Sequence, residues 1–490
     1  MSNQAAIIEH RTYGNFVKPR TPGIWRLGLI GTGAVFAIGI LAMVVQAFAG
    51  LIAGLLVVGI GVIALTPLTI QTRDGRNGWT AALVWWAFRR SVKKGTNVYD
   101  PMVLNPDGGQ YGPLPGLLAR SELVTVADTL GNEFGVIEQG GAAKHFSALI
   151  ACESDGSALV DQGDIDVCVA RYGNYLADLG DEPGLVAASV TVQSAPDSGA
   201  GLQAEVDRLL SVDAPELTRS VLRQAVQKYP RASAHVTTWM TLTWTPTRAA
   251  TRRITREELL DHIATRLPGL VGALAGTGAG SARAMSADQI AELVADAYAP
   301  DRHVPAPAWD QLVPACQAHH DHLSHADTAS VTWSTTDAPR SAVHASVLVP
   351  LLRPHHDLTR KRVTILYRPH SSDKAAGVAD EDLRTAAGHA GARKGEQRAT
   401  DSRALQAARQ QAAEQASGAG LTRFSVMATA TTTTENRHKA EAILSQVSAT
   451  ARLKMRPVTY SQDVAFQTAL GIGVVPSAHT RVPSFVREQL

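Results

Sequence analysis

Residues 27–70 read LGLIGTGAVFAIGILAMVVQAFAGLIAGLLVVGIGVIALTPLTI and contain no charged side chain. The run divides near Ala49 and Gly50 into two segments of about 20 residues, and each is long enough, at 1.5 Å per helical residue, to cross the ~30 Å hydrocarbon layer of a bilayer. A secretory signal peptide would have an apolar core of only about 7 to 15 residues. The stretch therefore predicts a hairpin of two transmembrane helices.

Cationic residues flank this apolar run on both sides. They are Arg11, Lys18, Arg20 and Arg26 before it, and Arg73, Arg76, Arg89, Arg90, Lys93 and Lys94 after it. Because basic residues near a membrane span are retained in the cytoplasm, both ends of the hairpin are predicted to lie there. We therefore expect a multi-pass cell-membrane protein with two helices in the bilayer, and with both termini and the soluble region in the cytoplasm.

Small residues repeat along each predicted helix at intervals of 4 and 7. Such stripes let two helix backbones approach closely in a membrane. The predicted packing residues of the hairpin are Gly28, Thr32 and Gly39 in the first helix and Gly50, Gly54 and Gly61 in the second. Glycine is also frequent in membrane helices in general, so stripes that face lipid are the alternative.

A short tryptophan-rich segment follows the hairpin. Trp79 to Phe88 is an uncharged stretch that is too short to span a bilayer. Tryptophan favours the headgroup region and cations favour anionic lipid, so we predict a helix that lies in the membrane plane. Its interface anchors would be Trp79, Trp85, Trp86, Arg89, Arg90, Lys93 and Lys94. A core helix of the soluble region is the alternative.

The remaining chain has the pattern of an α+β protein. Residues 99–116 hold four prolines and four glycines, which is typical of a linker. Strands are predicted at 134–138, 146–152, 185–192, 232–244, 330–334, 342–349, 421–433 and 457–460. Helices are predicted at 164–179, 202–210, 216–229, 256–267, 286–298 and 435–453.

This alternation, clearest in the β-α-β element at residues 421–460, predicts a cytoplasmic mixed α/β region with ferredoxin-like β-α-β elements. The whole chain would then divide into four parts. These are a cytoplasmic N-terminal segment at 1–23, the hairpin at 24–70, a juxtamembrane helix and linker at 71–116, and an α+β region at 117–490, of one or two subdomains, with a polar helical insertion at about 371–418.

Charge and cysteine content narrow the possible partners. The formal net charge is +2, from 46 basic and 44 acidic residues, so no overall field would recruit nucleic acid, and no direct nucleic-acid binding is predicted. Cys152, Cys168 and Cys316 are widely spaced and form no C-x-x-C pair. We expect buried free thiols, with neither a disulfide framework nor a zinc knuckle.

A glycine-rich run at residues 276–281, GTGAGS, invites comparison with a phosphate-binding loop. A Walker A loop needs G-K-[ST], which this chain lacks, and a dinucleotide fingerprint needs a preceding strand, where this chain predicts a helix. We expect a flexible loop between helices. Asp161, Asp164 and Asp166 lie where acidic residues favour a helix start. The chain also lacks a G-x-S-x-G elbow, so no cofactor and no enzyme activity are predicted.

The densest group of potential metal ligands is His319, His320, Asp321, His322 and His325. On a helix, the i, i+3 spacing of His322 and His325 would permit chelation of a metal. No H-E-x-x-H pattern accompanies them, so a solvated helix or loop is the preferred interpretation, and whether the cluster binds a metal stays open.

Two passages of the soluble region resemble a known family. The first is SAHVTTWMTLTW at residues 233–244, followed by helices, and the second is TRFSVMATA at 422–430, its helix, and then YSQDVAFQTALG at 460–471. With the short N-terminal segment and the hairpin, this layout resembles PrgI-like membrane proteins of conjugation systems joined to the amino-terminal domain of TraC-like secretion ATPases. In that family the last passage leads into the nucleotide-binding domain, whereas this sequence ends at Leu490.

The resemblance implies a non-catalytic inner-membrane component of a type IV secretion or conjugation machine. Its partners would be the lipid bilayer, a separate TraC-like motor ATPase and other channel subunits in an oligomeric complex. The matching passages suggest Phe424, Gln462 and Phe466 as partner-docking residues. The EccE-like component of type VII secretion, with an EccC-like ATPase, has a similar layout. A membrane-tethered metal-dependent hydrolase built on the histidine cluster is a third hypothesis.

Overall fold

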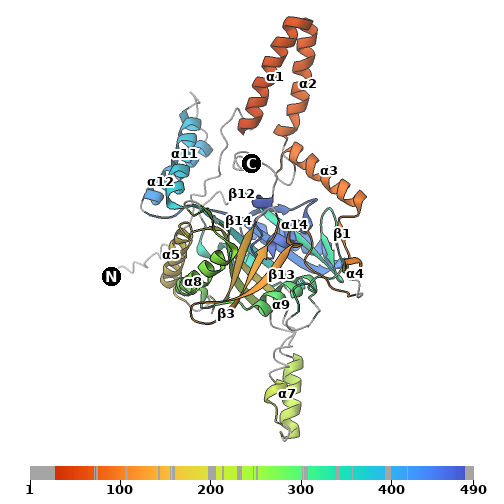
Figure 1. Ribbon diagram of the computed structural model, residues 1–490, viewed down its shortest axis with the longest axis vertical. Helices are drawn as coiled ribbons and strands as arrows, with labels where there is room; N and C mark the ends of the chain where they lie inside the picture. The colour runs from red at the N-terminus through yellow and green to blue at the C-terminus, as the bar shows by residue number, and fades with distance from the viewer. Residues whose placement is uncertain are drawn as a thin grey trace, which may run out of the picture.

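The computed structural model describes residues 28–70, 72, 76–104, 109–141, 144–154, 156, 160–196, 206–211, 214–228, 234–246, 248–249, 252–300, 302, 307–337, 343–355, 357–391, 399–416 and 418–479. A helical hairpin projects from one end of an α+β body whose centre is a large antiparallel sheet (Figure 1). The predicted α+β class is therefore confirmed. The predicted N-terminal segment, residues 1–23, lies outside the described residues.

The hairpin consists of α1 (Gly28–Ala49) and α2 (Leu51–Thr69). Gly50 makes the turn between them at φ +87°, a value that glycine adopts without strain. Both helices are long and apolar enough to cross a membrane, and only 6% and 11% of their apolar windows are buried. They are therefore not core helices of the body. Helix α3 (Gly78–Lys94) follows and leads down to the sheet (Figure 1).

One 13-stranded sheet has the order β1-β10-β11-β12-β14-β13-β5-β6-β4-β3-β2, with β15 also on β12 and β9 also on β4. Its strands are β1 (Val98–Tyr99), β2 (Ser121–Ala127), β3 (Glu133–Gln139), β4 (His145–Glu153), β5 (Leu185–Pro196), β6 (Ala234–Trp244), β9 (Ser281–Ala284), β10 (Cys316–Ala318), β11 (Leu323–His325), β12 (Thr328–Asp337), β13 (Arg360–Pro369), β14 (Thr422–Thr433) and β15 (Lys454–Pro457). A separate ribbon pairs β7 (Arg248–Ala249) with β8 (Arg252–Arg253).

The helices of the body are α4 (Pro101–Leu104), α5 (Gln162–Asp178), α7 (Glu216–Lys228), α8 (Arg256–Leu274), α9 (Ala287–Tyr298), α10 (Val349–Leu352), α11 (Ser372–Gly391), α12 (Ala399–Ala416), α13 (Arg437–Thr450) and α14 (Gln462–Ala469). Short turns of other helix types are η1 (Gly116–Leu118), η3 (Ala275–Ala279), η4 (Ala345–Leu348), η5 (Thr434–Asn436) and η6 (Pro476–His479). Helices α8 and α9 begin with capping boxes at Thr255 and Ser286.

The sheet contains two ferredoxin-like units. In the first, β4-α5-β5-β6-α8-β9, strand β6 lies between β4 and β5, and β4 lies between β6 and β9. In the second, β12-α10-β13-β14-α13-β15, strand β14 lies between β12 and β13, and β12 lies between β14 and β15. Both have the split β-α-β-β-α-β connection. The predicted ferredoxin-like elements are thus present twice.

The two units meet edge to edge where β5 pairs with β13 in antiparallel register. Thr191 and Thr364 lie opposite each other there, and their hydroxyls are 3.1 Å apart. The correspondence extends further: hairpin β2-β3 matches β10-β11, the helical insertion containing α7 matches α11-α12, and α9 matches α14. The body is therefore a structural repeat, which was not predicted from the sequence.

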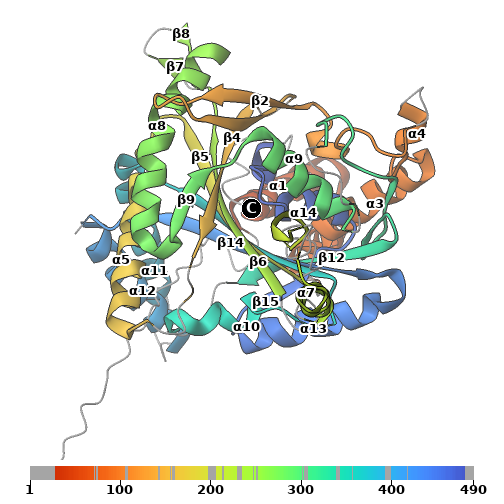
Figure 2. The same cartoon turned by 90° about the horizontal axis from the view of Figure 1, so that it is seen from below.

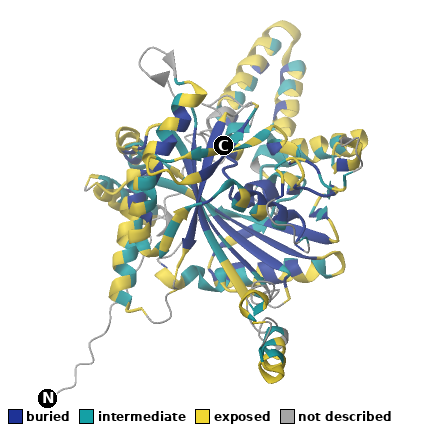
Figure 3. Cartoon of the chain, turned by 60° about the horizontal axis from the view of Figure 1, so that its bottom comes forward, coloured by how far each residue is buried: buried dark blue, intermediate teal, exposed yellow. Residues whose placement is uncertain are grey.

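The two faces of the sheet carry different kinds of buried side chain. Helices α5 and α8 cover an apolar face that contains Met240, Leu242 and Trp244, and α10 and α13 continue that layer over the second unit (Figure 2). The other face carries paired hydroxyls, such as Ser330 with Thr431 at 2.7 Å. Here α9, α14 and the segment after α14 cover the sheet, and its strands form the most deeply buried part of the molecule (Figure 3).

Some predicted elements are wrong. The strand expected at 342–349 is η4 and the start of α10, while β13, which carries Arg360 to Arg362, was missed. The return strand lies at 454–457 instead of 457–460. The glycine-rich run is no loop between helices, because η3 leads through Gly280 into β9.

The predicted linker is part of the body in its described residues. Tyr99 belongs to β1 and pairs with Cys316 of β10, and Leu114 is only 2% exposed. Prolines and glycines here shape a packed irregular segment instead of a free tether. The three cysteines are free thiols, buried at Cys152 and Cys316 and partly buried at Cys168.

Candidate functional site

The contact between α1 and α2 depends on two of the predicted glycines. A Cβ atom at Gly54 would lie 2.9 Å from Gln46 Cβ and 3.2 Å from the Ala42 carbonyl oxygen. A Cβ at Gly61 would lie 2.5 Å from Ile38 Cγ2. Both distances are shorter than packed side chains allow, so a larger residue at either position would push the helices apart.

The other predicted seam residues have different places. Gly39 is exposed, with no atom within 4 Å of a Cβ built there, and Gly50 forms the turn with equally open surroundings. The seam of α1 runs through Gly31 and Ala42, which are buried, so the predicted stripe was one residue out of phase. Thr32 is half-buried beside that seam. Gly28 is the first residue of α1, and its surroundings lie outside the described residues.

Helix α3 contains no buried residue, which argues against the core-helix alternative. Trp79, Trp85 and Trp86 are between 41% and 54% exposed. Trp79 donates its indole N–H to the Ala64 carbonyl of α2 at 2.7 Å, so the helix starts against the hairpin. The Arg89 and Arg90 guanidinium groups lie 4.8 and 5.5 Å from the ring centroids of Trp85 and Trp86. Lys93 and Lys94 complete the last turn. Exposed aromatics beside cations suit a lipid headgroup layer.

Contacts of described residues join the base of the hairpin and α3 to the body. Arg76, between α2 and α3, donates to the Thr459 carbonyl at 3.0 Å. Phe88 of α3 packs on Tyr460 with ring centroids 5.7 Å apart. The loop of residues 458–461, between β15 and α14, therefore touches the base of the hairpin.

Two of the three predicted docking residues are buried. Phe466 is 0% exposed and packs on the rings of Tyr298 and His325 at centroid distances of 5.0 and 5.2 Å. Gln462 is also 0% exposed: its amide oxygen accepts from the Thr332 backbone N–H at 2.9 Å and its nitrogen donates to the Thr332 carbonyl at 3.2 Å. Assigning these two residues to a docking surface was therefore wrong. Phe424 is 38% exposed and remains accessible.

The burial of α14 could not be predicted from its own sequence, because the partners of its polar groups lie on distant strands. The end of α14 and the segment after it cross the hydroxyl-lined face of the sheet, where side chains donate to their carbonyl groups. Thr364 donates to the Ala469 carbonyl at 2.7 Å, and Thr241 and Trp239 donate to the Gly471 carbonyl at 2.5 and 3.1 Å. A polar helix thus becomes a core element because its polar groups find partners inside.

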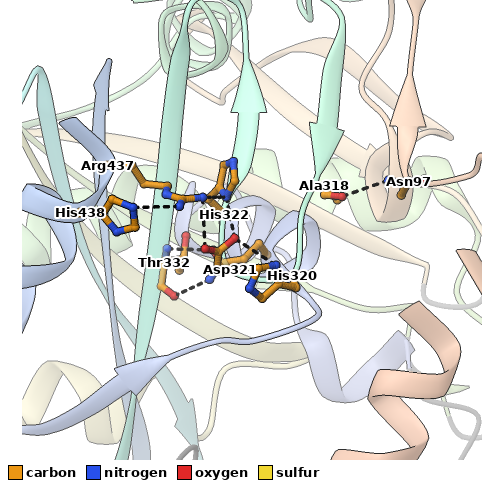
Figure 4. Close-up of polar contacts among 9 residues, drawn as sticks. Asn97, Ala318, His320, Asp321, His322, Thr332, Arg437 and His438 are labelled. Carbon is orange, nitrogen blue, oxygen red and sulfur yellow. Dashed lines mark hydrogen bonds and ion pairs between the residues drawn. The ribbon is translucent and has the colours of Figure 1, made fainter. Parts of the chain in front are cut away.

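The histidine cluster lies on the strand hairpin β10-β11, so His322 and His325 do not share the helical face that the metal-binding alternative required. Figure 4 shows Asp321 between His320, His322 and Arg437. Asp321 Oδ1 lies 2.7 Å from His322 Nδ1, and Asp321 Oδ2 lies 3.2 Å from Arg437 Nη1. His319 stacks on His322 at 4.3 Å between centroids. His325 is separate and buried, with Nδ1 2.6 Å from the Tyr298 carbonyl oxygen.

The electrostatics of this cluster follow from its packing. Burial opposes the charge of Asp321, but the His322 hydrogen bond and the nearby cations outweigh it and lower the pKa of the carboxyl. Burial, together with His322, lowers the pKa of His319. Burial also lowers the pKa of His325 to about 4, which keeps it neutral near pH 7. Among the described residues, no three His, Cys, Asp or Glu side chains are arranged to hold a metal ion.

Two surface features were not predicted from the sequence. The first is the insertion between β5 and β6, where Leu209, Leu217 and Val221 are 67%, 76% and 56% exposed. The second is a group of arginines beside α14, Arg368, Arg423 and Arg456, which line one cavity together with Arg76. Predicting β13 correctly would have revealed the latter, because the β13-β14 register sets Arg368 opposite Arg423.

Comparison with known proteins concerns the hairpin. Residues 20–80 match the family model of a domain of unknown function (DUF8461). No curated protein matches the chain. The similarity to that family therefore covers the hairpin and the start of α3.

Proposed function

We propose that this protein is a membrane-anchored, non-catalytic platform of a secretion or conjugation machine of the type IV kind, and that it docks a separate TraC-like motor ATPase in the cytoplasm. One observation carries the proposal. An exposed apolar hairpin is attached at one end of the body, and an exposed, partly apolar helical insertion projects from the opposite end (Figure 1). This arrangement suits a platform that holds a partner away from a membrane.

The anchor is supported by both sequence and structure. The outward faces of α1 and α2 are apolar along their length, and the cations of α3 follow directly. Apolar helices exposed in this way are stable in lipid and not in water. Basic residues on both sides of the hairpin favour a cytoplasmic body and two cytoplasmic termini.

The insertion containing α7 is the better docking candidate now that Gln462 and Phe466 are known to be buried. Leu217 and Val221 lie one helical turn apart on α7 and share a face. That face carries no described body contact, whereas the corresponding insertion, α11-α12, buries Ala375 and Ala379. An apolar stripe on a projecting helix is suited to a groove on a partner.

Cysteine labelling tests the anchor. In a chain whose native cysteines are replaced, a reporter cysteine at Gly50 should react with a membrane-impermeant reagent added to intact cells, and one at Ser371 should not. Protection at residue 50 together with labelling at residue 371 would contradict the proposed topology.

Affinity purification from native membranes tests the docking. Leu217→Asp with Val221→Asp should reduce the co-purified ATPase at least about tenfold, because two carboxylates would have to enter an apolar contact. Thr218→Asp with Gln224→Asp is the matched control, since it adds the same charge at exposed polar positions of α7. Equal ATPase recovery with all three proteins would refute docking through α7. Recovery of an EccC-like ATPase would favour the EccE-like alternative.

A further inference from the structure

Tyr460, the residue before the N-cap of α14, has an unusual backbone conformation. Its φ is +62°, in the left-handed region that residues with a Cβ atom rarely adopt. A bulky residue persists there only when its surroundings hold it, and such strain clusters in segments that can change conformation. The contacts of Tyr460 must therefore offset the cost of this conformation.

Among the described residues, two others besides glycine have positive φ, and each has a local reason. Arg452 (φ +54°) follows α13, where the Leu453 N–H donates to the Ser448 carbonyl at 3.0 Å, as in a Schellman motif. Ala326 (φ +46°) lies in the two-residue turn between β11 and β12, and the common turns of this length require positive φ. Tyr460 belongs to neither kind of turn, because it precedes a helix.

The strain at Tyr460 follows from how its loop is fixed. Val458 donates its backbone N–H to the Thr332 carbonyl at 3.0 Å, and the Gln462 side chain bonds both the N–H and the carbonyl of Thr332. Both ends of the loop are thus fixed on one residue of β12. The chain turns within the three residues between them, 459–461, so strain at Tyr460 acts directly on the Gln462 contact.

Contacts from outside the loop hold Tyr460 in place. Its N–H donates to the His320 carbonyl, in the turn between β10 and β11, at 2.6 Å. Its ring centroid lies 6.1 Å from that of His320 and 5.7 Å from that of Phe88 on α3. Arg76, at the base of the hairpin, donates to the carbonyl of the preceding residue, Thr459, at 3.0 Å. The conformation of Tyr460 thus depends partly on α3 and the hairpin base.

The first turn of α14 is sensitive to this loop. Its N-cap, Ser461, makes no side-chain capping hydrogen bond within the described structure, so the contact of Gln462 with Thr332 fixes the start of the helix. The other end of α14 continues into the segment that covers the hydroxyl-lined face of the sheet. A shift at Tyr460 would therefore reach both α14 and this segment.

We propose that Tyr460 is a strained joint through which the position of α3 controls the stability of α14. With α3 docked, the Phe88 ring helps to hold Tyr460 in its left-handed conformation, and the Gln462 contact stays closed. When α3 moves away, Tyr460 relaxes to negative φ, the Gln462 contact opens, and the first turn of α14 loosens. This device goes beyond the proposed platform function, because it depends on the contact between α3 and the loop and needs no motor partner.

Hydrogen-deuterium exchange of the detergent-solubilised full chain, measured by mass spectrometry, tests the joint. Phe88→Ala should raise the exchange rate of the α14 amides at least about fivefold, because the loop loses its contact with α3. Leu83→Ala is the matched control, since it truncates an apolar side chain that is 59% exposed on the same helix, and it should leave that rate unchanged. The amides of β6 are the internal reference and should stay protected in every variant.

Two substitutions at residue 460 separate strain from simple contact. Tyr460→Ala and Tyr460→Gly both remove the ring, but only glycine adopts φ +62° without cost. Tyr460→Ala should therefore raise α14 exchange as Phe88→Ala does, whereas Tyr460→Gly should keep it close to the wild-type rate. Adding Phe88→Ala to Tyr460→Gly should have no further effect. Arg452→Gly, at a positive φ with a local reason, should not change α14 exchange.

Three results would overturn the proposal. Unchanged α14 exchange in Phe88→Ala would show that α3 does not hold the loop. Equal exchange rates in the alanine and glycine variants at residue 460 would show that the ring acts by contact and not through backbone strain. Exchange that rises equally in α14 and β6 would show a general destabilisation of the body instead of a local joint.

Discussion

The two halves of the body have the same order of elements but differ in what their insertions do. In the second half, α11 and α12 pack on each other and bury small side chains such as Ala386 and Ala408. In the first half, the helix at the same topological position, α7, leaves Leu217 and Val221 exposed. A repeated scaffold thus supplies one self-contained insertion and one with an unpaired apolar stripe.

The helices that follow the two units differ in a similar way. Helix α9 is amphipathic and buries Ile290 and Val294 against the sheet. Helix α14 buries polar side chains as well, including Gln462 and Gln467. The first is stabilised by apolar area and the second by hydrogen bonds inside the body, so substitutions should affect the two halves through different mechanisms.

The largest effect is expected at Gly473, which follows α14. A Cβ there would lie 1.9 Å from Ser147 Oγ, at φ +90°. Gly473→Ala should lower the free energy of unfolding by more than about 4 kcal/mol, which is enough to unfold a marginal domain. Limited proteolysis of the membrane fraction should show a degraded body and an intact hairpin.

Gly131 is the matched control for that experiment, because it has φ +84° but no atom within 4 Å of a Cβ. Gly131→Ala should cost only backbone strain, about 1 to 2 kcal/mol. Equal protease resistance of the two variants would show that the segment after α14 does not hold the sheet face.

A second substitution addresses the polar core of α14. Gln462→Ala removes both hydrogen bonds to the Thr332 backbone. It leaves the buried Thr332 N–H without that partner, whereas the Thr332 carbonyl still accepts from the Val458 N–H, so the cost should be about 1 to 3 kcal/mol. Thermal unfolding in detergent should show a clearly lower Tm. Gln446→Ala, at an exposed position of α13, should leave the Tm unchanged. A variant at 462 as stable as the wild type would mean that α14 is held by apolar contacts alone.

Each half also contains one buried histidine with a low pKa. Burial lowers the pKa of His145 and of His325 to about 4 in the folded protein, below the ordinary value of about 6.5. Protons therefore bind more readily to the unfolded chain. The stabilising contribution is complete above about pH 6.5 and is lost as the pH falls toward 4, by up to about 3 kcal/mol for each histidine.

Tm measured between pH 7 and pH 4 checks this prediction. The wild type should lose stability steadily over that window, and His325→Gln should have a shallower slope because the buried titratable ring is gone. An identical slope in the two proteins would mean that His325 does not contribute to the acid sensitivity.

The smallest effect concerns the hairpin. Gly54→Leu should separate α1 from α2, at a cost of about 1 to 3 kcal/mol, because its side chain would occupy the backbone contact with Gln46 and Ala42. Gly39→Leu is the matched control on the open side of α1. Disulfide crosslinking between cysteines placed in the two helices should fall only in the Gly54 variant. Unchanged crosslinking there would place Gly54 toward lipid.

The sequence predicts those elements whose pattern has a single explanation. The long uncharged run with a glycine near its middle forms the expected hairpin of two helices, and the β-branched runs at 185–192 and 421–433 form strands as expected. Strand β13 was not predicted, because charged residues such as Arg360, Lys361 and Arg362 are usually expected at the surface and not in a buried strand. In the structure all three are buried, and Arg362 donates to the Gln193 amide oxygen. Partners from distant strands cannot be read from local sequence.

For the candidate sites too, local patterns could be predicted, whereas contacts with distant residues could not. The close packing at Gly54 and Gly61 was predicted because small residues that repeat along an apolar helix are a local pattern. Gln462 and Phe466 were misassigned because their burial depends on Thr332 and Tyr298, which lie more than a hundred residues away. The repeat was not predicted because the two halves share the order of their elements but not their sequence. The helical insertions at equivalent positions, for example, have different sequences.

The platform function is tested most directly by ATP hydrolysis measured on two samples from native membranes. The first is the affinity-purified assembly, and the second is the same full-length chain stripped of its partners. We predict activity in the assembly, a motor ATPase among its chains, and no hydrolysis by the stripped protein. Hydrolysis by the stripped chain alone, or an assembly that contains no ATPase, would contradict the proposed platform function.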